Sequence, residues 1–343
     1  MSLTRRLTVV VTALVLLGLS MAAALAIGGV HVPVGRAVDV VLRRMGLGDH
    51  GVTLLDDQLV WQLRLPRVLG AAAVGAALAG CGAVLQSLTR NDLADPYLLG
   101  IASGAQVGAV TVIVLGVSVM GVTGGAALTL AGFIGALASL IIVLAVAAGR
   151  GGTLNPTRVV LAGVVVAYVC SAYSSVVILT AGEGDAARRV LSWTLGSLAG
   201  VRWGSAVFLA ILALVAVALF VLCADSLDAF AFGETSARSL GVSVNRVRWL
   251  LMTGTALVTA GAVAYAGAIG FVGLVVPHIG RIVVGPRHRL LLPLSALLGA
   301  ILLVWADTLA RSLVDGSEIP VGAVTALVGA PFFIWLLRRT GRT

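Results

Sequence analysis

The chain has 343 residues, of which 59% are hydrophobic and only 11% are charged, and its formal net charge is +9. Soluble domains have about 25% charged residues, so this composition excludes an ordinary soluble enzyme or binding domain. An all-α integral membrane protein is predicted instead.

Eight long tracts contain no Asp, Glu, Lys or Arg, and a membrane-crossing helix needs about 20 apolar residues. The tracts are residues 7–35, 68–89, 97–149, 159–182, 203–224, 249–280, 290–306 and 319–337. The third is long enough for two crossings, with a glycine-rich turn at residues 121–125. The sixth holds either one long helix or two short helices broken around Gly267, Gly270 and Gly273. Nine or ten spans are therefore predicted.

Arginines at the two ends of the chain indicate its orientation. Arg5 and Arg6 precede the first tract, and Arg338, Arg339 and Arg342 follow the last, so the positive-inside rule places both ends in the cytoplasm. Two ends on one side require an even number, which predicts ten spans in a multi-pass protein of the cytoplasmic membrane. A cleaved signal is the alternative for the first tract. A signal core has about 7 to 15 apolar residues, and this tract is longer, which favours a retained helix.

The remaining arginines follow the same bias incompletely. Those expected outside are Arg36, Arg43, Arg44, Arg64, Arg67, Arg188, Arg189, Arg202 and Arg311. The presence of nine arginines on this side suggests that something on the outer side favours positive charge. No run of basic residues resembles a nucleic-acid site, so lipid and acidic protein partners are expected, and no nucleic acid.

All 23 basic residues other than histidine are arginine. The absence of lysine excludes a Walker A phosphate loop and a lysine Schiff base, so nucleotide would have to be bound by another chain. Cys81, Cys170 and Cys223 have no metal-ligand spacing and are expected to be small packing residues. No cofactor and no metal are predicted.

Seven ordered segments resemble the permease subunits of ABC importers for iron-siderophores, haem and cobalamin, the FecCD type. They are residues 63–67 (LRLPR), 82–104 (GAVLQSLTRNDLADPYLLGIASG), 193–198 (WTLGSL), 233–241 (GETSARSLG), 270–281 (GFVGLVVPHIGR), 306–311 (ADTLAR) and 318–332 (EIPVGAVTALVGAPF). The resemblance covers nearly the whole chain. One departure is Asp92, which stands where the family usually has proline after the asparagine. We expect it to loosen that turn without changing the function.

The resemblance implies one permease domain over residues 1–343, with about ten helices in the type II importer arrangement. Such permeases dimerise around a central pathway, with two ATPase subunits inside and a substrate-binding protein outside. The second permease would be another copy of this chain or a similar chain, and the sequence leaves both open. The sequence does not identify the helices that line the pathway. The fifth span, with Tyr168 and residues 171–175, is the candidate.

A cytoplasmic loop at about residues 225–248 contains the expected ATPase contact. From the residues alone it reads as a short solvated helix, with Glu234 in the favourable first turn and Gly241 able to close the helix in the left-handed conformation. The resemblance implies that this segment is the coupling helix. The residues expected to contact the ATPase are Gly233, Glu234, Ala237, Arg238, Leu240 and Gly241.

Arg64 and Arg67 flank Pro66 just before an apolar tract, so both guanidinium groups could face outward. The resemblance implies that arginines at this rim meet glutamates of the binding protein; headgroup anchoring is the alternative. Arg311 is a third docking candidate. Asp307 lies four residues before it, so the two could instead neutralise each other along one helix face.

Polar residues at two chain breaks are expected to have structural or gating roles. Asn91, Asp95 and Pro96 lie in the break after the second span, and Pro277 and His278 lie within a short span. A lone histidine without a second ligand is more often a structural hydrogen-bonding residue than a metal ligand.

The resemblance favours a permease subunit, not an enzyme, that moves a ferric siderophore, with haem or cobalamin as alternatives. An ion-coupled transporter would need carboxylates buried within its spans, and Asp307 is the only clear one. An intramembrane enzyme would need a nucleophile with a base, and Ser171, Ser174 and Ser175 have no histidine partner in the sequence pattern.

Overall fold

A computed structural model describes residues 3–28, 30, 32–48, 51–148, 152–314 and 316–340. Arg342 lies outside these residues. Seven of the described helices are long and apolar enough to cross a membrane, and three shorter apolar helices accompany them. The ten are α1 (Leu3–Ala26), α4 (Leu65–Thr89), α5 (Ile101–Leu115), α6 (Gly124–Ala147), α7 (Pro156–Ala181), α9 (Trp203–Leu222), α12 (Val244–Ala266), α13 (Val272–Val284), α14 (His288–Ala310) and α15 (Val321–Thr340). The prediction of a ten-helix membrane protein is confirmed.

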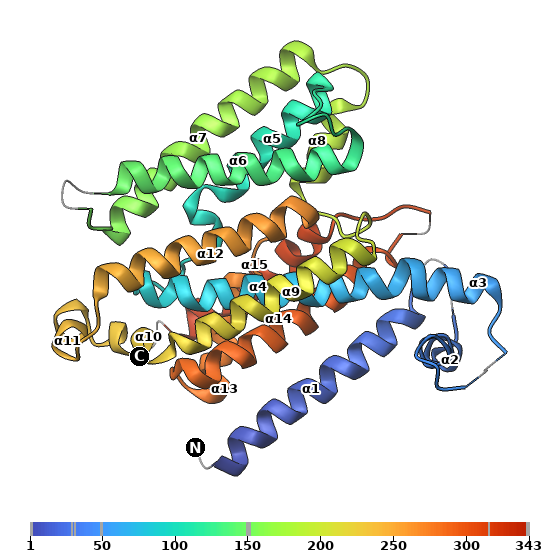
Figure 1. Cartoon of the computed structure of the whole chain (residues 1–343), viewed down its shortest axis with the longest axis horizontal. Helices are drawn as coiled ribbons and strands as arrows, with labels where there is room; N and C mark the ends of the chain where they lie inside the picture. Colours follow the sequence, from blue (N-terminus) through green and yellow to red (C-terminus); the bar gives the residue numbers. More distant parts are fainter. Residues whose placement is uncertain are drawn as a thin grey trace.

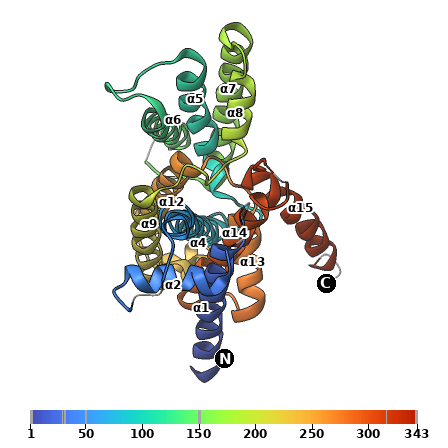
Figure 2. The same cartoon turned by 90° about the vertical axis from the view of Figure 1, so that its right-hand side faces the viewer.

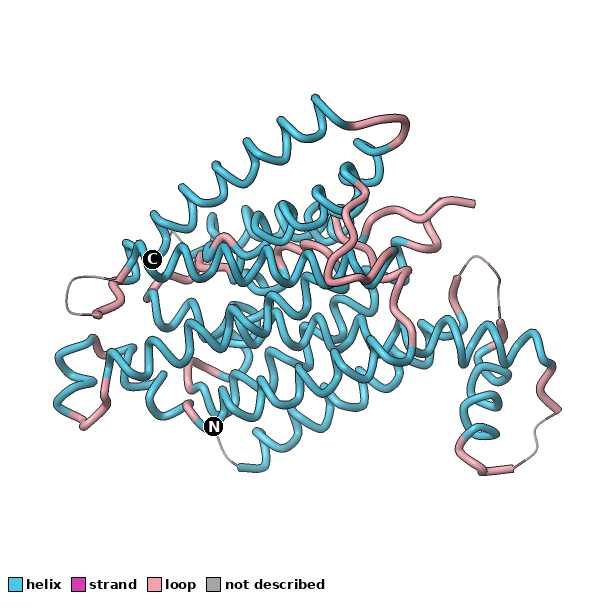
Figure 3. The backbone as a smooth tube through the Cα atoms, turned by 45° about the horizontal axis from the view of Figure 1, so that its top comes forward, coloured by secondary structure: helices cyan, strands magenta, loops and turns pink. Residues whose placement is uncertain are grey.

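Short helices lie at the two ends of the bundle. α2 (Val34–Arg44), α3 (Leu54–Asp57) and α8 (Ala186–Thr194) lie at one end, and α10 (Ala224–Ala231) and α11 (Glu234–Ser239) lie at the other, together with both termini (Figure 1). Figure 3 shows the termini at the same end again. We call the end with α10, α11 and the termini the inner end, following the arginine bias, and the opposite end the outer end.

The α4 helix forms the centre of the bundle. It is surrounded by α9, α12 and α14, while α5 to α8 form a separate group on one side and α15 leans out on another (Figure 2). Glycines permit this close packing, since a methyl group added at Gly75 would lie 2.1 Å from the Gly299 carbonyl oxygen of α14. At Gly82 it would lie 1.9 Å from the Gly273 carbonyl oxygen of α13. Small residues at helix interfaces are the usual means of close packing within a membrane.

The tract at residues 249–280 forms two helices, because the chain leaves the helical conformation between α12 and α13. Gly267 and Phe271 both have positive φ angles, of 69° and 68°. The freed backbone groups of Ile269 are bonded by one side chain: the Tyr97 hydroxyl accepts from the Ile269 N–H at 2.9 Å and donates to its carbonyl at 3.1 Å. Non-helical backbone is tolerated at membrane depth only when it is satisfied in this way.

Tyr97 belongs to η2 (Pro96–Leu99), a short 3₁₀ helix between α4 and α5. At the outer end, η1 (Gln58–Arg64) is a π-helical stretch that joins α3 directly to α4. The turn expected at residues 121–125 is also present, since α5 ends at Leu115 and α6 begins at Gly124.

Candidate functional site

The expected coupling segment is a six-residue helix, α11, as the sequence predicts. Gly233 precedes it with a φ of 91°, and Gly241 follows it with a φ of 83°. The Ala237 side chain is buried, whereas Arg238 and Leu240 are exposed at the inner end of the molecule. The segment therefore offers one cationic and one apolar side chain to a partner.

Glu234 is bound within the chain instead of facing solvent freely. Arg248 of α12 donates to Glu234 Oε1 at 2.5 Å and to the Leu154 carbonyl at 2.8 Å. The Arg248 side chain is only 6% exposed, and its guanidinium carbon lies 5.7 Å from the centre of the Phe230 ring. Arg248 thus fixes α11 and the end of α10 to α12. The sequence analysis did not identify it, because no local pattern links it to Glu234.

A second group at the inner end joins three elements. His288 Nδ1 lies 2.6 Å from Asp228 Oδ1 of α10, and His288 Nε2 lies 2.5 Å from the Ser87 hydroxyl of α4. The His288 backbone N–H also donates to Asp228 Oδ1, at 3.0 Å. Sequence reasoning missed this group, because the partners of His288 lie 60 and 201 positions away.

The break after α4 is held by its own polar residues. Arg90 ends α4 in the left-handed conformation, and the Asn91 side chain accepts from the Leu93 N–H at 2.9 Å. Asp95 caps η2 by accepting from the Tyr97 N–H at 2.9 Å. Burial raises the pKa of Asp95 to about 6, and the bond from Tyr97 opposes that rise.

Asp92 has a partner that a proline could not have. It lies 3.3 Å from Arg281 Nη1 at the end of α13, and Arg281 also donates to Gln86 of α4 at 2.5 Å. An ion pair therefore connects this loop to α13.

Pro96, Pro277 and His278 lie close to the same region. Pro96 is buried against Gly273, where an added methyl group would lie 2.8 Å from Pro96 Cδ. Pro277 is buried inside α13, and His278 beside it is partly exposed. Within the described ranges, no three His, Cys, Asp or Glu side chains are grouped as metal ligands.

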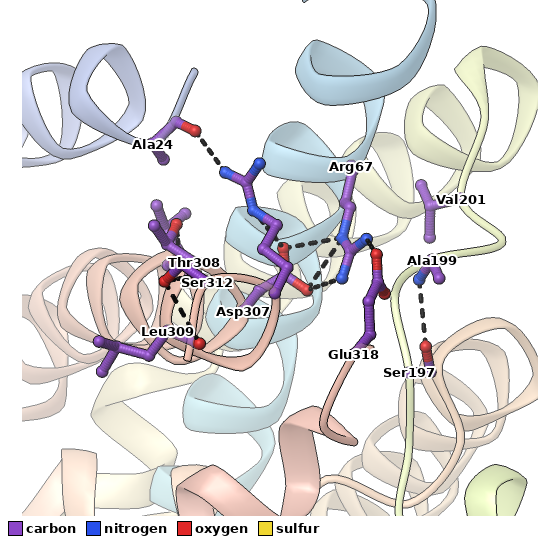
Figure 4. A network of polar contacts seen from close by, with 12 residues as sticks. Ala24, Arg67, Ser197, Ala199, Val201, Asp307, Thr308, Leu309, Ser312 and Glu318 are labelled. Atoms are coloured by element: carbon purple, nitrogen blue, oxygen red, sulfur yellow. Dashed lines mark hydrogen bonds and ion pairs between the residues drawn. The ribbon is translucent and has the colours of Figure 1, made fainter. Parts of the chain in front are cut away.

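At the outer end, five charged side chains gather, which we call the outer cluster: Arg64, Arg67, Asp307, Arg311 and Glu318. Arg67 donates to both Asp307 oxygens, with Nε 2.9 Å from Oδ2 and Nη2 2.9 Å from Oδ1 (Figure 4). Its Nη1 donates to Glu318 at 2.9 Å. Arg64, Arg67, Arg311 and Glu318 line a cavity of about 750 Å³, together with Arg202.

One expectation about these arginines is wrong. Arg64 does not face outward: it is buried and donates to the carbonyls of Leu25, Ala26 and Val30. The local proline signal could not reveal this, because the acceptors belong to the end of α1 and the residues after it.

Asp307 forms an ion pair with Arg311, as the alternative reading of the sequence expected, but its hydrogen-bonded partner is Arg67. Arg311 Nε lies 3.7 Å from Asp307 Oδ2, and Arg311 Nη2 donates instead to the Ala24 carbonyl. Arg311 Nε is buried without a hydrogen bond among the described residues.

The fifth span, α7, has a largely exposed surface. Tyr168 and Val169 are exposed, whereas Ser174 is buried and donates to the Cys170 carbonyl at 2.9 Å. Ser175 likewise donates to the Ser171 carbonyl within the helix. An exposed apolar face of this kind requires lipid or another protein as its neighbour.

Comparison with known proteins gives consistent results. The model of the FecCD transport family matches residues 14–339. The chain is 42% identical over 289 residues to the cobalamin import system permease protein BtuC of Halobacterium salinarum, which covers 84% of this chain and 75% of that protein. It is 42% identical over 285 residues to the vitamin B12 import system permease protein BtuC of Vibrio cholerae, covering 83% and 84%.

An uncharacterized ABC transporter permease protein of Bacillus subtilis, YvrB, is 38% identical over 330 residues, covering 95% of this chain and 92% of that protein. Among solved structures, an inward-facing conformation of a putative metal-chelate type ABC transporter superposes with a TM-score of 0.84 at 29% identity, covering 97% of this chain and 99% of the other.

Proposed function

Because this chain belongs to the FecCD transport family, and is thus a transmembrane permease subunit of an ABC importer whose ATP is hydrolysed by a separate subunit, we propose that its substrate is cobalamin. The observation that supports this choice is that the relatives at 42% identity from an archaeon and from a bacterium are both named cobalamin or vitamin B12 permeases. The sequence favoured a ferric siderophore, which remains an alternative prediction and forms one arm of the test.

The test is uptake into proteoliposomes that contain this chain with its ATPase and its substrate-binding protein. Radiolabelled cyanocobalamin, a ferric hydroxamate siderophore and haem are compared, each with and without ATP on the ATPase side. ATP-dependent uptake of cyanocobalamin alone is expected. Uptake of the siderophore or of haem instead would replace the substrate, and uptake that follows an ion gradient without ATP would overturn the importer mechanism.

The ATPase contact is proposed at α11. Its exposed Arg238 and Leu240 provide the contacting side chains, while Arg248 holds Glu234 so that the helix keeps its place. Glu234→Arg places a second cation beside the buried Arg248, and we expect it to abolish ATPase co-purification while leaving membrane insertion unchanged. Arg246→Glu is the control, because it changes charge nearby outside α11. Normal co-purification and transport by Glu234→Arg would refute this placement.

The binding protein is proposed to dock on the outer cluster. Arg67 Nη1 is bonded to Glu318, whose side chain is 47% exposed, so an incoming carboxylate can replace Glu318 without breaking the buried Arg67–Asp307 pair. Complementary charge at such a rim acts mainly on association rate and orientation. Arg202 lines the same cavity and is exposed, so Arg202→Glu should slow association. The control Arg188→Glu should have a smaller effect, because Arg188 lies on α8 at the same end, is 84% exposed and does not line the cavity. Equal association rates for the two variants would refute docking at the cluster.

We also propose that two permease chains form the transport pathway between them, with the exposed face of α7 at or near their contact. Either a second copy or a similar chain is compatible with this surface. Mass measurement of the complex in nanodiscs distinguishes the two.

A further inference from the structure

Asp228, His288 and Ser87 form a continuous hydrogen-bonded group across three elements, which we call the inner relay. His288 is the first residue of α14 and is only 4% exposed, whereas the Asp228 side chain that it contacts is 33% exposed. Hydrogen bonds to an ionised group in a buried position are stronger and more directional than those on a surface. The inner relay is therefore a firm mechanical connection between α10 and the two membrane helices.

The same three residue types form the triad of serine hydrolases, but here the serine has no room for a substrate. Ser87 lies within α4 and its hydroxyl is also 3.0 Å from the Ala83 carbonyl of the same helix. The neighbouring cavity of about 600 Å³ is lined by Asp228, Arg287 and Arg289, and neither Ser87 nor His288 reaches its wall. The geometry thus suits a structural connection and not a nucleophile.

α10 is directly continuous with the proposed ATPase contact. Only Phe232 and Gly233 separate it from α11. α10 has a second connection to α14, the Asp225–Arg289 pair, but these side chains are 71% and 74% exposed. Such surface pairs contribute little, about 0 to 1 kcal/mol. The inner relay, with His288 buried and Asp228 33% exposed, is shielded better from water and is therefore the stronger of these two connections from α10 to α14.

The two helices that the inner relay reaches extend to the opposite end of the protein. α4 carries Arg67 and α14 carries Asp307 and Arg311, so both helices end in the outer cluster. They also pack backbone to backbone at Gly75 and Gly299, which makes independent sliding of either helix costly. A displacement of α10 would thus move Ser87 and His288, and with them α4 and α14. These two helices are packed together, and their far ends form the outer cluster.

We propose that Asp228, His288 and Ser87 are positioning residues that transmit movement of the α10–α11 segment to α4 and α14, and so connect the ATPase to the outer cluster. This proposal rests on the function proposed above, in which α11 meets the ATPase and the outer cluster meets the binding protein. It predicts that weakening the inner relay separates ATP hydrolysis from transport while the complex stays assembled.

The test compares variants of the whole importer complex in proteoliposomes. Ser87→Ala and Asp228→Ala each remove one side chain of the inner relay, and Ser87→Thr retains the hydroxyl. Alanine is used at position 228 because both bonds from His288 go to Asp228 Oδ1, an acceptor that asparagine would keep. Thr89→Val is the matched control, because the Thr89 hydroxyl is also on α4 but bonds only the Leu85 carbonyl of its own helix, at 2.7 Å. Three quantities are measured: co-purification of the ATPase, stimulation of ATP hydrolysis by the binding protein alone, and radiolabelled cyanocobalamin taken up per ATP hydrolysed.

We expect Ser87→Ala and Asp228→Ala to retain the ATPase and its basal rate. Stimulation and uptake per ATP should both fall by at least about 5-fold, the lower end of typical coupling between sites. Ser87→Thr and Thr89→Val should resemble the unmodified protein. The double variant Ser87→Ala/Asp228→Ala should lose no more than the more severe single variant, because both substitutions interrupt the same connection.

The proposed role of the inner relay would be overturned if stimulation of ATP hydrolysis is unchanged in both single variants, or if the losses of the single variants add in the double variant. Loss of the ATPase from the complex would also overturn it, because the residues would then serve assembly. If the unmodified complex is stimulated by its binding protein but takes up no cyanocobalamin, the cobalamin proposal fails and the inner relay is judged from stimulation. If it shows neither activity, both proposals fail.

Discussion

Asp307→Asn is the most direct test of the outer cluster, because Asp307 is 1% exposed and is the hydrogen-bonded partner of Arg67 within α14. Asparagine has nearly the same shape but keeps only one acceptor oxygen, and its amide N–H₂ would face the N–H groups of Arg67. Removing one member of a buried ion pair costs about 3 to 5 kcal/mol. Glu318 still neutralises Arg67 in the variant, which favours the lower end of that range.

A loss of about 3 kcal/mol corresponds to about 4 °C in the unfolding temperature for a chain of this size. The assay is thermal unfolding of the purified protein in one detergent, followed by uptake measured per folded molecule. Glu318→Gln is the matched control, because it removes the other carboxylate on Arg67 but from a side chain that is 47% exposed, where a pair is worth about 0 to 1 kcal/mol. Equal unfolding temperatures for the two variants would refute the reasoning. ATP-dependent uptake by Asp307→Asn would also remove the ion-coupled alternative, which needs this carboxylate.

Gly82→Ala should destabilise the fold by about 1 to 3 kcal/mol or more, because the added methyl group would lie 1.9 Å from the Gly273 carbonyl oxygen. The control Gly80→Ala should be tolerated, because its nearest contact would be at 3.7 Å. Thermal unfolding of both variants checks this. Tyr97→Phe removes the hydroxyl that bonds the N–H and carbonyl of Ile269. We expect the free energy of unfolding to fall by about 1 to 3 kcal/mol and amide hydrogen exchange at Ile269 to become faster. Exchange as slow as in the unmodified protein would contradict this role. Asp95 has a pKa of about 6 in the folded protein against a lower value in the unfolded chain, so its charge opposes folding above pH 6 and this cost disappears as the pH falls toward 4. Asp95→Asn can still cap η2, and it should stabilise the fold at pH 7.5 by at most about 3 kcal/mol, which is measured as a higher unfolding temperature. Near pH 4 the unfolding temperature should be unchanged. An equal effect at both pH values would be inconsistent with this.

The number of spans and the position of both ends of the chain on one side followed from the sequence, because crossing a membrane depends on local hydropathy and each helix satisfies its own backbone within one segment. The α11 helix was predictable for a similar reason, since the residues that begin and end it, Gly233 and Gly241, lie close together in the sequence. The ordered motifs were enough to indicate the family. Each of these signals lies within a short stretch of chain.

Only the tertiary structure decided the partners of the charged residues. Arg67 meets Asp307 across 240 positions, and Ser87 meets His288 across 201, so no local spacing could indicate either pair. The same holds for the break between α12 and α13. Glycines in the sequence suggested a break near residue 270, but the side chain that bonds its backbone comes from Tyr97, 172 positions away. Hydropathy determines which segments enter the membrane, whereas the packing of those segments determines which buried charges and open backbone groups become neighbours.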